Sequence, residues 1–290
     1  MSAAPLRKAD LQPANLTEGE FAFTSDDFTR VAAMLYEDSG IHLSDGKVTL
    51  VYSRLAKRLR QLGLQTFKEY CELVSSDAGA AERRNMLSAL TTNLTRFFRE
   101  PHHFDHFRQQ TLASVVDAAR SGARLRFWSA GCSSGQEPYS MALSLLAVLP
   151  EAVDLDVRIL ATDIDPVIVG QARAGVYPDE AISAIPTDLR GRWLKREGAG
   201  QWSMGEAVRR LIVFNELNLM GSWPMKGRFQ AIFCRNVAIY FEEPVQERLW
   251  SRFGDGLVEG GRLYVGHSER VTDPRFQNDG LTTYRLRTSK

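Results

Sequence analysis

The sequence has few cysteines and no long apolar run. Cys71, Cys132 and Cys234 are odd in number and far apart, which argues against a disulfide framework and against a zinc site. The best apolar run, residues 141–149, is much shorter than the about 20 residues that a membrane-spanning helix needs. Residues 1–20 are polar and lack the apolar core of a signal peptide. We therefore expect a cytoplasmic protein in which residues 1–20 form a flexible leader.

The sequence also lacks an excess of charge of either sign. It has 36 lysines and arginines against 35 aspartates and glutamates, a formal net charge of +1. This balance gives no reason to expect a nucleic acid or a membrane surface as partner, so any electrostatic steering has to come from a local patch. One such patch is a basic ridge within residues 45–61, where Lys47, Arg54 and Arg58 fall within roughly 40° of each other around a helix. A run of charges is most often only a solvated face.

Two parts of the chain differ in their periodicity. Residues 21–107 are expected to be all helical, with helices at 26–38, 45–61, 67–74 and 80–90. In residues 108–290, strands alternate with helices; the expected strands are 124–129, 157–162, 211–215, 231–234 and 261–266, with 284–287 as a final edge strand. This alternation predicts an α/β domain with a mostly parallel, doubly wound sheet and helices on both faces. Residues 177–210 interrupt it with several prolines and glycines, which indicates an insertion.

A glycine-bearing turn, residues 130–135, follows the first expected strand. Open parallel sheets bind ligands at the carboxyl ends of their strands, and glycine lets the backbone approach a ligand closely. The turn is neither the Gly-x-Gly-x-x-Gly of dinucleotide sites nor a phosphate loop, and on its own it is often only a tight turn. The next strand ends in Asp163 and Asp165. We assign Asp165 to the cap of the following helix and Asp163 to the hydroxyls of a ribose.

The turn and Asp163 together indicate a nucleoside cofactor without a pyrophosphate, of which S-adenosylmethionine is the commonest. Glu137, just after the turn, suits a polar cofactor group as well as it suits a simple partner of the helix dipole. His102, His103 and His106 lie close together, but no glutamate or cysteine completes a metal site with them in the sequence. We therefore expect no metal.

Four segments carry a resemblance to a known family. They are residues 91–104 (TTNLTRFFREPHHF), 131–140 (GCSSGQEPYS), 233–241 (FCRNVAIYF) and 266–269 (GHSE). In this order they resemble the signature motifs of the CheR-type chemotaxis protein methyltransferases, and the similarity extends from about residue 21 to 286. One departure is Ala238, where a larger apolar residue is usual.

The resemblance implies a helical N-terminal domain, a doubly wound class I methyltransferase domain and a small antiparallel β-subdomain inserted in the latter. It implies S-adenosylmethionine as cofactor and glutamates of methyl-accepting chemotaxis receptors as substrate, methylated on the receptors' cytoplasmic helical domain. The sequence shows no seam for self-association, so we take the enzyme to be a monomer. Arg99 and Tyr240 would lie nearest the transferring methyl group. The residues expected to contact the cofactor are Asn93, Thr95, Arg99, Glu137, Asp163, Asn218, Leu219, Arg235 and Asn236.

The implied partner gives the basic ridge a second interpretation. Receptor methylation segments of this family are glutamate-rich helices, which Lys47, Arg54 and Arg58 would steer and align. In some members the β-subdomain also docks a tethering peptide at the end of the receptor. The turn at residues 196–200 is shorter here, so we expect methylation without a tether.

The implied chemistry needs no general base, because a glutamate carboxylate has an ordinary pKa of about 4.3 and is already ionised at neutral pH. Catalysis should then rest mainly on alignment and on exclusion of water. Two rival functions are a methyltransferase acting on RNA or a small molecule and a non-enzymatic sensor of S-adenosylmethionine. The neutral net charge disfavours RNA, and the intact Arg99 and Tyr240 disfavour a sensor.

Overall fold

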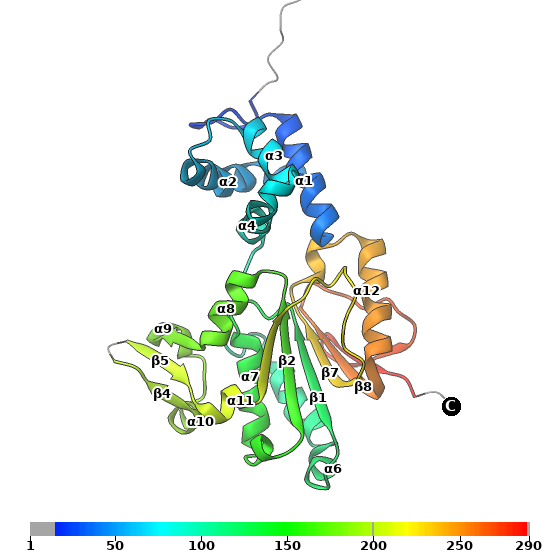
Figure 1. The fold of residues 1–290 in the computed structure, drawn as a ribbon. Helices are drawn as coiled ribbons and strands as arrows, with labels where there is room; N and C mark the ends of the chain where they lie inside the picture. The colour runs from blue at the N-terminus through cyan, green and yellow to red at the C-terminus, as the bar shows by residue number, and fades with distance from the viewer. Residues whose placement is uncertain (1–14, 199, 289–290) are drawn as a thin grey trace, which may run out of the picture. The chain divides into compact units, whose positions relative to one another are not determined.

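The structure, a computed structural model, describes residues 15–198 and 200–288 (Figure 1). Residues 1–14 of the expected leader lie outside this range. The described chain forms two compact units: residues 15–38 with 42–90, and residues 39–41 with 91–288. Within the described ranges, every helix is too short or too polar to cross a membrane.

The smaller unit is helical, as the periodicity predicted. Its helices are α1 (Ser25–Ser39), α2 (Val48–Leu62), α3 (Phe67–Ser75) and α4 (Ala80–Leu90), with 3-10 turns η1 (Asp45–Lys47) and η2 (Asp77–Gly79) before α2 and α4. Thr66 caps α3 in a capping box, since its side chain accepts from the Glu69 amide and the Glu69 carboxylate accepts from the Thr66 amide. Aromatic rings fill the centre of this unit, with the Phe23 and Phe67 centroids 4.3 Å apart.

The division between the units falls at Leu90–Thr91, earlier in the chain than the change of composition after residue 107 indicated. The intervening segment is helical at its end, in α5 (Pro101–His106) and the π-helical turn η3 (Phe107–Leu112). Its aromatic side chains Phe97, Phe104 and Phe107 are buried in the core of the larger unit. Helical periodicity alone therefore does not assign this segment to a domain, because tertiary packing decides where its apolar face is buried.

The larger unit contains a seven-stranded sheet in the order β6-β2-β1-β7-β8-β10-β9. The first five strands in this order pair in parallel, and β10 and β9 add an antiparallel edge. The strands are β1 (Leu125–Ala130), β2 (Val157–Asp163), β6 (Ile212–Glu216), β7 (Phe229–Cys234), β8 (Leu257–Val265), β9 (Phe276–Gly280) and β10 (Thr283–Leu286). The doubly wound parallel sheet is thus confirmed.

The expected edge strand, β10, is instead an inner strand, because β9 pairs outside it. The sequence of β9, FQNDG, is almost wholly polar and ends in glycine, so it has no apolar alternation that would have revealed it.

Alternate residues of the strands face opposite layers of helix. On one face, Phe127, Ile159 and Phe233 belong to a core that includes α7 (Gln136–Val148). On the other face, Trp128 and Ile232 pack with α12 (Glu243–Gly256), which lies along β7 and β8 in Figure 1. The larger unit also contains the helical segments α6 (Val116–Arg120), η4 (Ala152–Asp154), α8 (Pro166–Ala174) and η5 (Ala238–Tyr240). Helices on both faces confirm the expected two-layer covering.

The expected insertion is a small antiparallel sheet in the order β3-β5-β4. Its strands are β3 (Val176–Pro178), β4 (Leu194–Arg196) and β5 (Gln201–Met204), and its short helices are α9 (Asp179–Ile182), α10 (Thr187–Trp193) and α11 (Glu206–Arg210). Gly175 begins the insertion in a left-handed conformation (φ +62°) that also ends α8. The chain then returns to the main sheet at β6.

Candidate active site

The glycine turn wraps over the carboxyl end of β2. The amides of Gly131 and Cys132 both donate to the Thr162 carbonyl, at 2.8 Å each. Gly131 has a φ of +88°, and a Cβ placed there would lie 2.4 Å from Cγ2 of Val237. Only glycine fits this position, because a side chain would collide with the loop after β7. The turn therefore brings the ends of β1, β2 and β7 together.

Asp163 lies buried beneath this turn at the end of β2. One carboxylate oxygen accepts from the Ser133 amide at 2.8 Å and the other from the Asp165 amide at 3.1 Å. Burial raises the pKa of Asp163, and these two backbone donors act against that rise. Each carboxylate oxygen can accept more than one hydrogen bond, so Asp163 both fixes the turn and keeps acceptor capacity for a ligand hydroxyl.

Asp165 caps α8, as predicted from the sequence: its side chain accepts from the Val167 amide at 2.9 Å. Its other oxygen accepts from the side-chain amide of Asn93 at 3.0 Å. The Asn93 carbonyl in turn accepts from the Ser133 hydroxyl at 2.9 Å. The segment that begins at Asn93 is thereby attached to the glycine turn, although the two lie far apart in the sequence.

Arg235, at the carboxyl end of β7, is a buried bridge between two glutamates. Its Nη1 lies 3.1 Å from Glu137 and its Nη2 lies 3.1 Å from Glu100, while Nη2 also donates to the Arg99 carbonyl. Ser129 donates to the other oxygen of Glu137 at 2.7 Å. The guanidinium group therefore connects the start of α7 to the segment before α5.

The two glutamates respond differently to Arg235. Burial raises the pKa of Glu137, and Arg235 only partly offsets this. Burial also acts to raise the pKa of Glu100, but Arg235 and His267 outweigh it and bring that pKa to about 2. Glu100 is the less enclosed of the two, so its attraction to the cation costs less desolvation.

Glu269, the last residue of the GHSE segment, fixes the loop after β7. One of its oxygens accepts from the amides of Asn236 and Gly266, and the other from those of Val237 and Ile239. The side chain is buried, and Asn236 is held at a φ of +59°. The motif was recognised in the sequence, but this positioning role was not, because it depends on four amides converging in space.

A second loop, after β6, reaches the same end of the sheet. The Leu217 amide donates to the Asp163 carbonyl at 2.9 Å. Arg252 of α12 donates to the carbonyls of Leu219 and Gly221. Its guanidinium also lies over the Trp223 ring, 3.9 Å from the centroid. The loop that contains the predicted cofactor residues Asn218 and Leu219 thus begins beside Asp163 and is anchored to α12.

Arg99 and Tyr240 are attached to this assembly through their backbones. The Arg99 carbonyl accepts from Arg235, and the Arg99 side chain donates to the Leu94 carbonyl at 3.0 Å. Tyr240 ends η5, directly after the amides that Glu269 holds. Both side chains are half-buried, as is the predicted Thr95.

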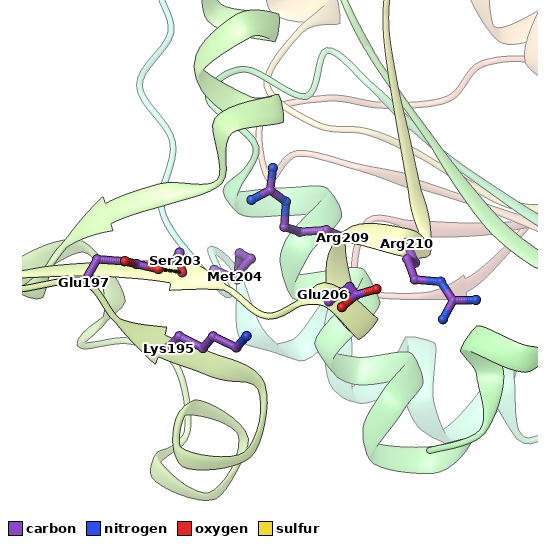
Figure 2. Close-up of a pocket in the computed structure, with 7 residues that line it drawn as sticks. All are labelled: Lys195, Glu197, Ser203, Met204, Glu206, Arg209 and Arg210. Atoms are coloured by element: carbon purple, nitrogen blue, oxygen red, sulfur yellow. Dashed lines mark hydrogen bonds between the residues drawn. The ribbon is translucent and has the colours of Figure 1, made fainter.

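The inserted subdomain carries a separate hollow of about 430 Å³, shown in Figure 2. It is lined by Lys195, Glu197, Ser203, Met204, Glu206, Arg209 and Arg210. The Ser203 hydroxyl donates to Glu197 across it at 2.7 Å. The lining contains no residue of the four sequence motifs, so we assign the cofactor to the ends of the parallel strands and not to this hollow.

Two members of the basic ridge help to hold the helical unit together. Arg54 donates to the carbonyls of Ala89 and Leu90 at the end of α4, at 3.1 and 3.0 Å. Arg58 pairs with Glu82 through two bonds of 2.9 and 2.6 Å, and Glu82 is also bonded by Tyr70. Lys47, the third member, is exposed.

Arg58→Ala is therefore expected to destabilise the protein. The change leaves the Glu82 carboxylate, 8% exposed, without its cation, at an expected cost of about 2–3 kcal/mol. Lys47→Ala, on the same ridge, is the matched control and should leave the unfolding free energy within about 0.5 kcal/mol of the parent. Chemical denaturation of both variants measures this; an equal free energy for the two would mean that the Arg58–Glu82 pair contributes nothing.

The fold and site define a class of protein. A parallel sheet with a glycine turn after its first strand, a buried acid after its second and helices on both faces is the arrangement of nucleoside-cofactor domains. Two family models match the chain: "CheR methyltransferase, SAM binding domain" over residues 93–285 and "CheR methyltransferase, all-alpha domain" over residues 26–91. The chain belongs to the CheR methyltransferase family. It is a methyltransferase that uses S-adenosylmethionine.

Curated relatives agree with this assignment. A "Probable chemotaxis protein methyltransferase" of Rhizobium etli is 54% identical over 88% of this chain and 97% of its own length. "Chemotaxis protein methyltransferase 2" of Pseudomonas aeruginosa is 42% identical over 86% of this chain and 88% of its own. The "Chemotaxis protein methyltransferase" of Escherichia coli is 37% identical over 91% of this chain and 92% of its own.

Proposed function

We propose that this enzyme methylates glutamate side chains of methyl-accepting chemotaxis receptors, forming glutamyl methyl esters in sensory adaptation. The enzyme would act in the cytoplasm, as a monomer, on the receptor's cytoplasmic helical domain. One observation supports the choice of a carboxylate substrate. Four carboxylates near the ends of the strands are paired or bonded: Glu100 and Glu137 lie beside the Arg235 cation, and Asp163 and Glu269 accept from backbone amides.

Acids held in this way serve as fixed acceptors and counter-charges, and they are poorly placed to remove a proton from a substrate. A carboxylate substrate has no proton to lose at neutral pH, because its ordinary pKa is about 4.3. An amine or hydroxyl substrate would in contrast need a base. The arrangement therefore favours an anionic oxygen nucleophile.

The cofactor supplies a methyl group bound to a positively charged sulfur. The residues of this chain that we propose hold it are Asn93, Thr95, Arg99, Glu137, Asp163, Asn218, Leu219, Arg235 and Asn236. One feature of the site fits a nucleoside: Asp163 retains acceptor capacity for hydroxyls. Arg235 keeps Glu137 and the Arg99 backbone in place, so that the site is ordered before the cofactor arrives.

We assign Arg99 and Tyr240 to the reacting end of the site. Arg99 has a fork of donors that can hold a carboxylate, of either the substrate or the cofactor. The Tyr240 hydroxyl can donate to one oxygen of the substrate and so direct the other toward the methyl group. Because the hydroxyl acts only when the substrate is present, its loss should change turnover and leave cofactor affinity unaffected.

Tyr240→Phe is expected to lower turnover about tenfold, the effect of one lost hydrogen bond of about 1.4 kcal/mol. The dissociation constant for S-adenosylmethionine should stay within about twofold of the parent value. Steady-state kinetics and calorimetric titration measure the two quantities, and Tyr284→Phe in β10 is the control. An equal loss of turnover and affinity would place Tyr240 in the cofactor site instead.

We further propose that the helical unit docks the receptor helix through the basic ridge, Lys47, Arg54 and Arg58, and that a tether peptide is not required. A glutamate-rich helix would meet Lys47 at the exposed start of the ridge. The internal bonds of Arg54 and Arg58 make their charge reversal a poor test, because it would also disturb α4 and Glu82.

Lys47→Glu is accordingly expected to slow receptor methylation a few-fold at low ionic strength, with unchanged thermal unfolding. The difference from the parent should shrink as salt is added, because salt screens exposed charges over about 10 Å at 0.1 M. Lys68→Glu, an exposed lysine of α3, is the matched control. Equal rates for Lys47→Glu and Lys68→Glu at low salt would remove the start of the ridge from the docking surface.

A further inference from the structure

Four buried polar atoms without a hydrogen-bond partner gather around the start of α5. They are Glu100 Oε2, His102 Nε2, His103 Nδ1 and Arg235 Nε, out of seven such atoms among the described residues. Buried polar atoms are rarely left without a partner. The atoms of Glu100, His102 and His103 can act as acceptors or ligands, whereas Arg235 Nε is a donor that a cation does not satisfy. Glu100 reaches this place because its backbone is left-handed (φ +58°), which turns its side chain back over the helix that follows.

The surroundings of His103 define which ring nitrogen carries the proton. Nε2 lies 3.2 Å from the Leu281 carbonyl and 2.9 Å from the Thr282 hydroxyl. A carbonyl only accepts, so the tautomer with the proton on Nε2 is the one that satisfies Leu281, and in that tautomer Nδ1 presents a lone pair.

The lone pair of His103 faces another acceptor. Nδ1 lies 3.4 Å from Glu100 Oε2, and in this tautomer neither atom carries a proton. Two acceptors at this distance repel each other unless a hydrogen-bond donor or a cation lies between them. Arg235 approaches the same carboxylate oxygen, at 3.1 Å, but from its Nη2 and in an orientation that leaves Oε2 unsatisfied.

The spacing suits a metal ion. Two ligands bound at about 2.1 Å in tetrahedral geometry are about 3.4 Å apart, which matches the separation of His103 Nδ1 and Glu100 Oε2. The ligand atoms of Glu100, His102 and His103 all lie within 4.8 Å of one another. The Leu281 carbonyl bound to the far nitrogen of His103 is the usual outer partner that orients a metal-binding histidine.

We propose that Glu100, His102 and His103 bind a divalent transition-metal cation of the Zn²⁺ type. The sequence argued against a metal because no acid completed a site with the histidines; the left-handed backbone of Glu100 supplies that acid. His106, four residues after His102, takes no part in the site: it lies 3.0 Å from the Tyr264 hydroxyl and 3.0 Å from the Asp279 carbonyl. His267 borders the cluster: its Nδ1 is 3.1 Å from Glu100 Oε1 and its side chain is 69% exposed, which leaves a way in from solvent.

A bound cation inhibits methyl transfer. It competes with Arg235 for Glu100, and Arg235 also holds Glu137 and the Arg99 carbonyl at the cofactor site. The positive charge of Arg235 weakens metal binding in return, so the site fills when the free metal concentration rises and empties when it falls. The site is thus a regulatory one, outside the transfer reaction itself.

Titration of the purified full-length protein with Co²⁺ tests the proposal, because tetrahedral Co²⁺ absorbs visible light strongly. One equivalent of Co²⁺ should bind, and Zn²⁺ should displace it. His102→Ala should lower the affinity tenfold or more, since it removes one of three ligands. His42→Ala, an exposed histidine of the helical unit, should retain the parent affinity. His102 is half-buried, and thermal unfolding verifies that its variant is folded.

Inhibition provides a second readout. Zn²⁺ should inhibit methyl transfer by the parent enzyme, and His102→Ala should need at least tenfold more Zn²⁺ for the same inhibition. The Co²⁺ spectrum does not depend on the substrate, so its result stands whether or not receptors are methylated. Absence of stoichiometric Co²⁺ binding, or equal binding by the parent and His102→Ala, would overturn the proposal and leave a buried water as the partner of these atoms.

Discussion

Glu269→Ala is expected to lower the rate of methyl transfer about 100-fold or more, as a displacement of about 1 Å at a reacting group does. Each Glu269 oxygen accepts from two backbone amides, and together these amides shape the loop that runs from Arg235 to Tyr240. Without the carboxylate, Asn236 loses the contact that stabilises its left-handed backbone. The unfolding free energy should fall by about 3 kcal/mol or more, because several charge-assisted bonds are lost.

Glu269→Gln tests whether the charge of the Glu269 side chain matters when its size and shape are kept. The glutamine amide is nearly isosteric, but its NH₂ group would face amide donors that need an acceptor. Turnover and cofactor affinity should both fall, with less effect on stability than in the alanine variant. Glu259→Gln, at an exposed glutamate of strand β8, is the control and should behave as the parent. Parent-like turnover in Glu269→Gln would show that the loop keeps its shape without this carboxylate.

Arg235→Met should be the most damaging single change in the site. It leaves the carboxylates of Glu100 and Glu137 buried without their cation, and breaking such an arrangement costs about 3–5 kcal/mol. Binding of S-adenosylmethionine should become undetectable, because the Arg99 backbone and Glu137 lose their common anchor. Chemical denaturation and calorimetric titration measure the two effects.

A triple variant, Arg235→Met with Glu100→Gln and Glu137→Gln, shows whether the instability of Arg235→Met comes from unpaired buried charge or from lost side-chain packing. Removing the two negative charges together with the cation should restore most of the stability, since unpaired buried charge is the source of the cost. Cofactor binding should remain absent. If the triple variant is as unstable as Arg235→Met alone, the loss arises from packing around Phe104, over whose ring the guanidinium lies, and the charge argument is wrong.

The sequence predicted the elements that contain strong periodic signals. The buried strands β1, β2 and β7 are short apolar runs bounded by turn residues, and the Asp165 cap follows from a standard local rule. Strand β9 was missed because its pairing with β10 is what makes it a strand, and its polar residues carry no local preference for one.

In the candidate site, too, local sequence signals predicted some features and missed those that depend on contacts between distant residues. Motifs located the glycine turn, Asp163 and Arg235, since these residue types are needed at strand ends. Motifs did not reveal that Glu269 accepts hydrogen bonds from four backbone amides, or that Arg58 forms an ion pair with Glu82. Both features depend on contacts between residues far apart in the chain. The metal site that we propose depends on the left-handed backbone of Glu100, which residue type does not predict.

The most direct test of the proposed function is to incubate the purified protein with S-adenosylmethionine carrying a tritiated methyl group and with membranes from receptor-bearing cells, and then to treat the products with mild base. The proposal predicts label on a receptor-sized band that mild base releases as volatile methanol, the property of a carboxyl methyl ester. Binding of the cofactor with no base-labile label would contradict glutamate methylation and would favour RNA, a small molecule or a sensing role in its place.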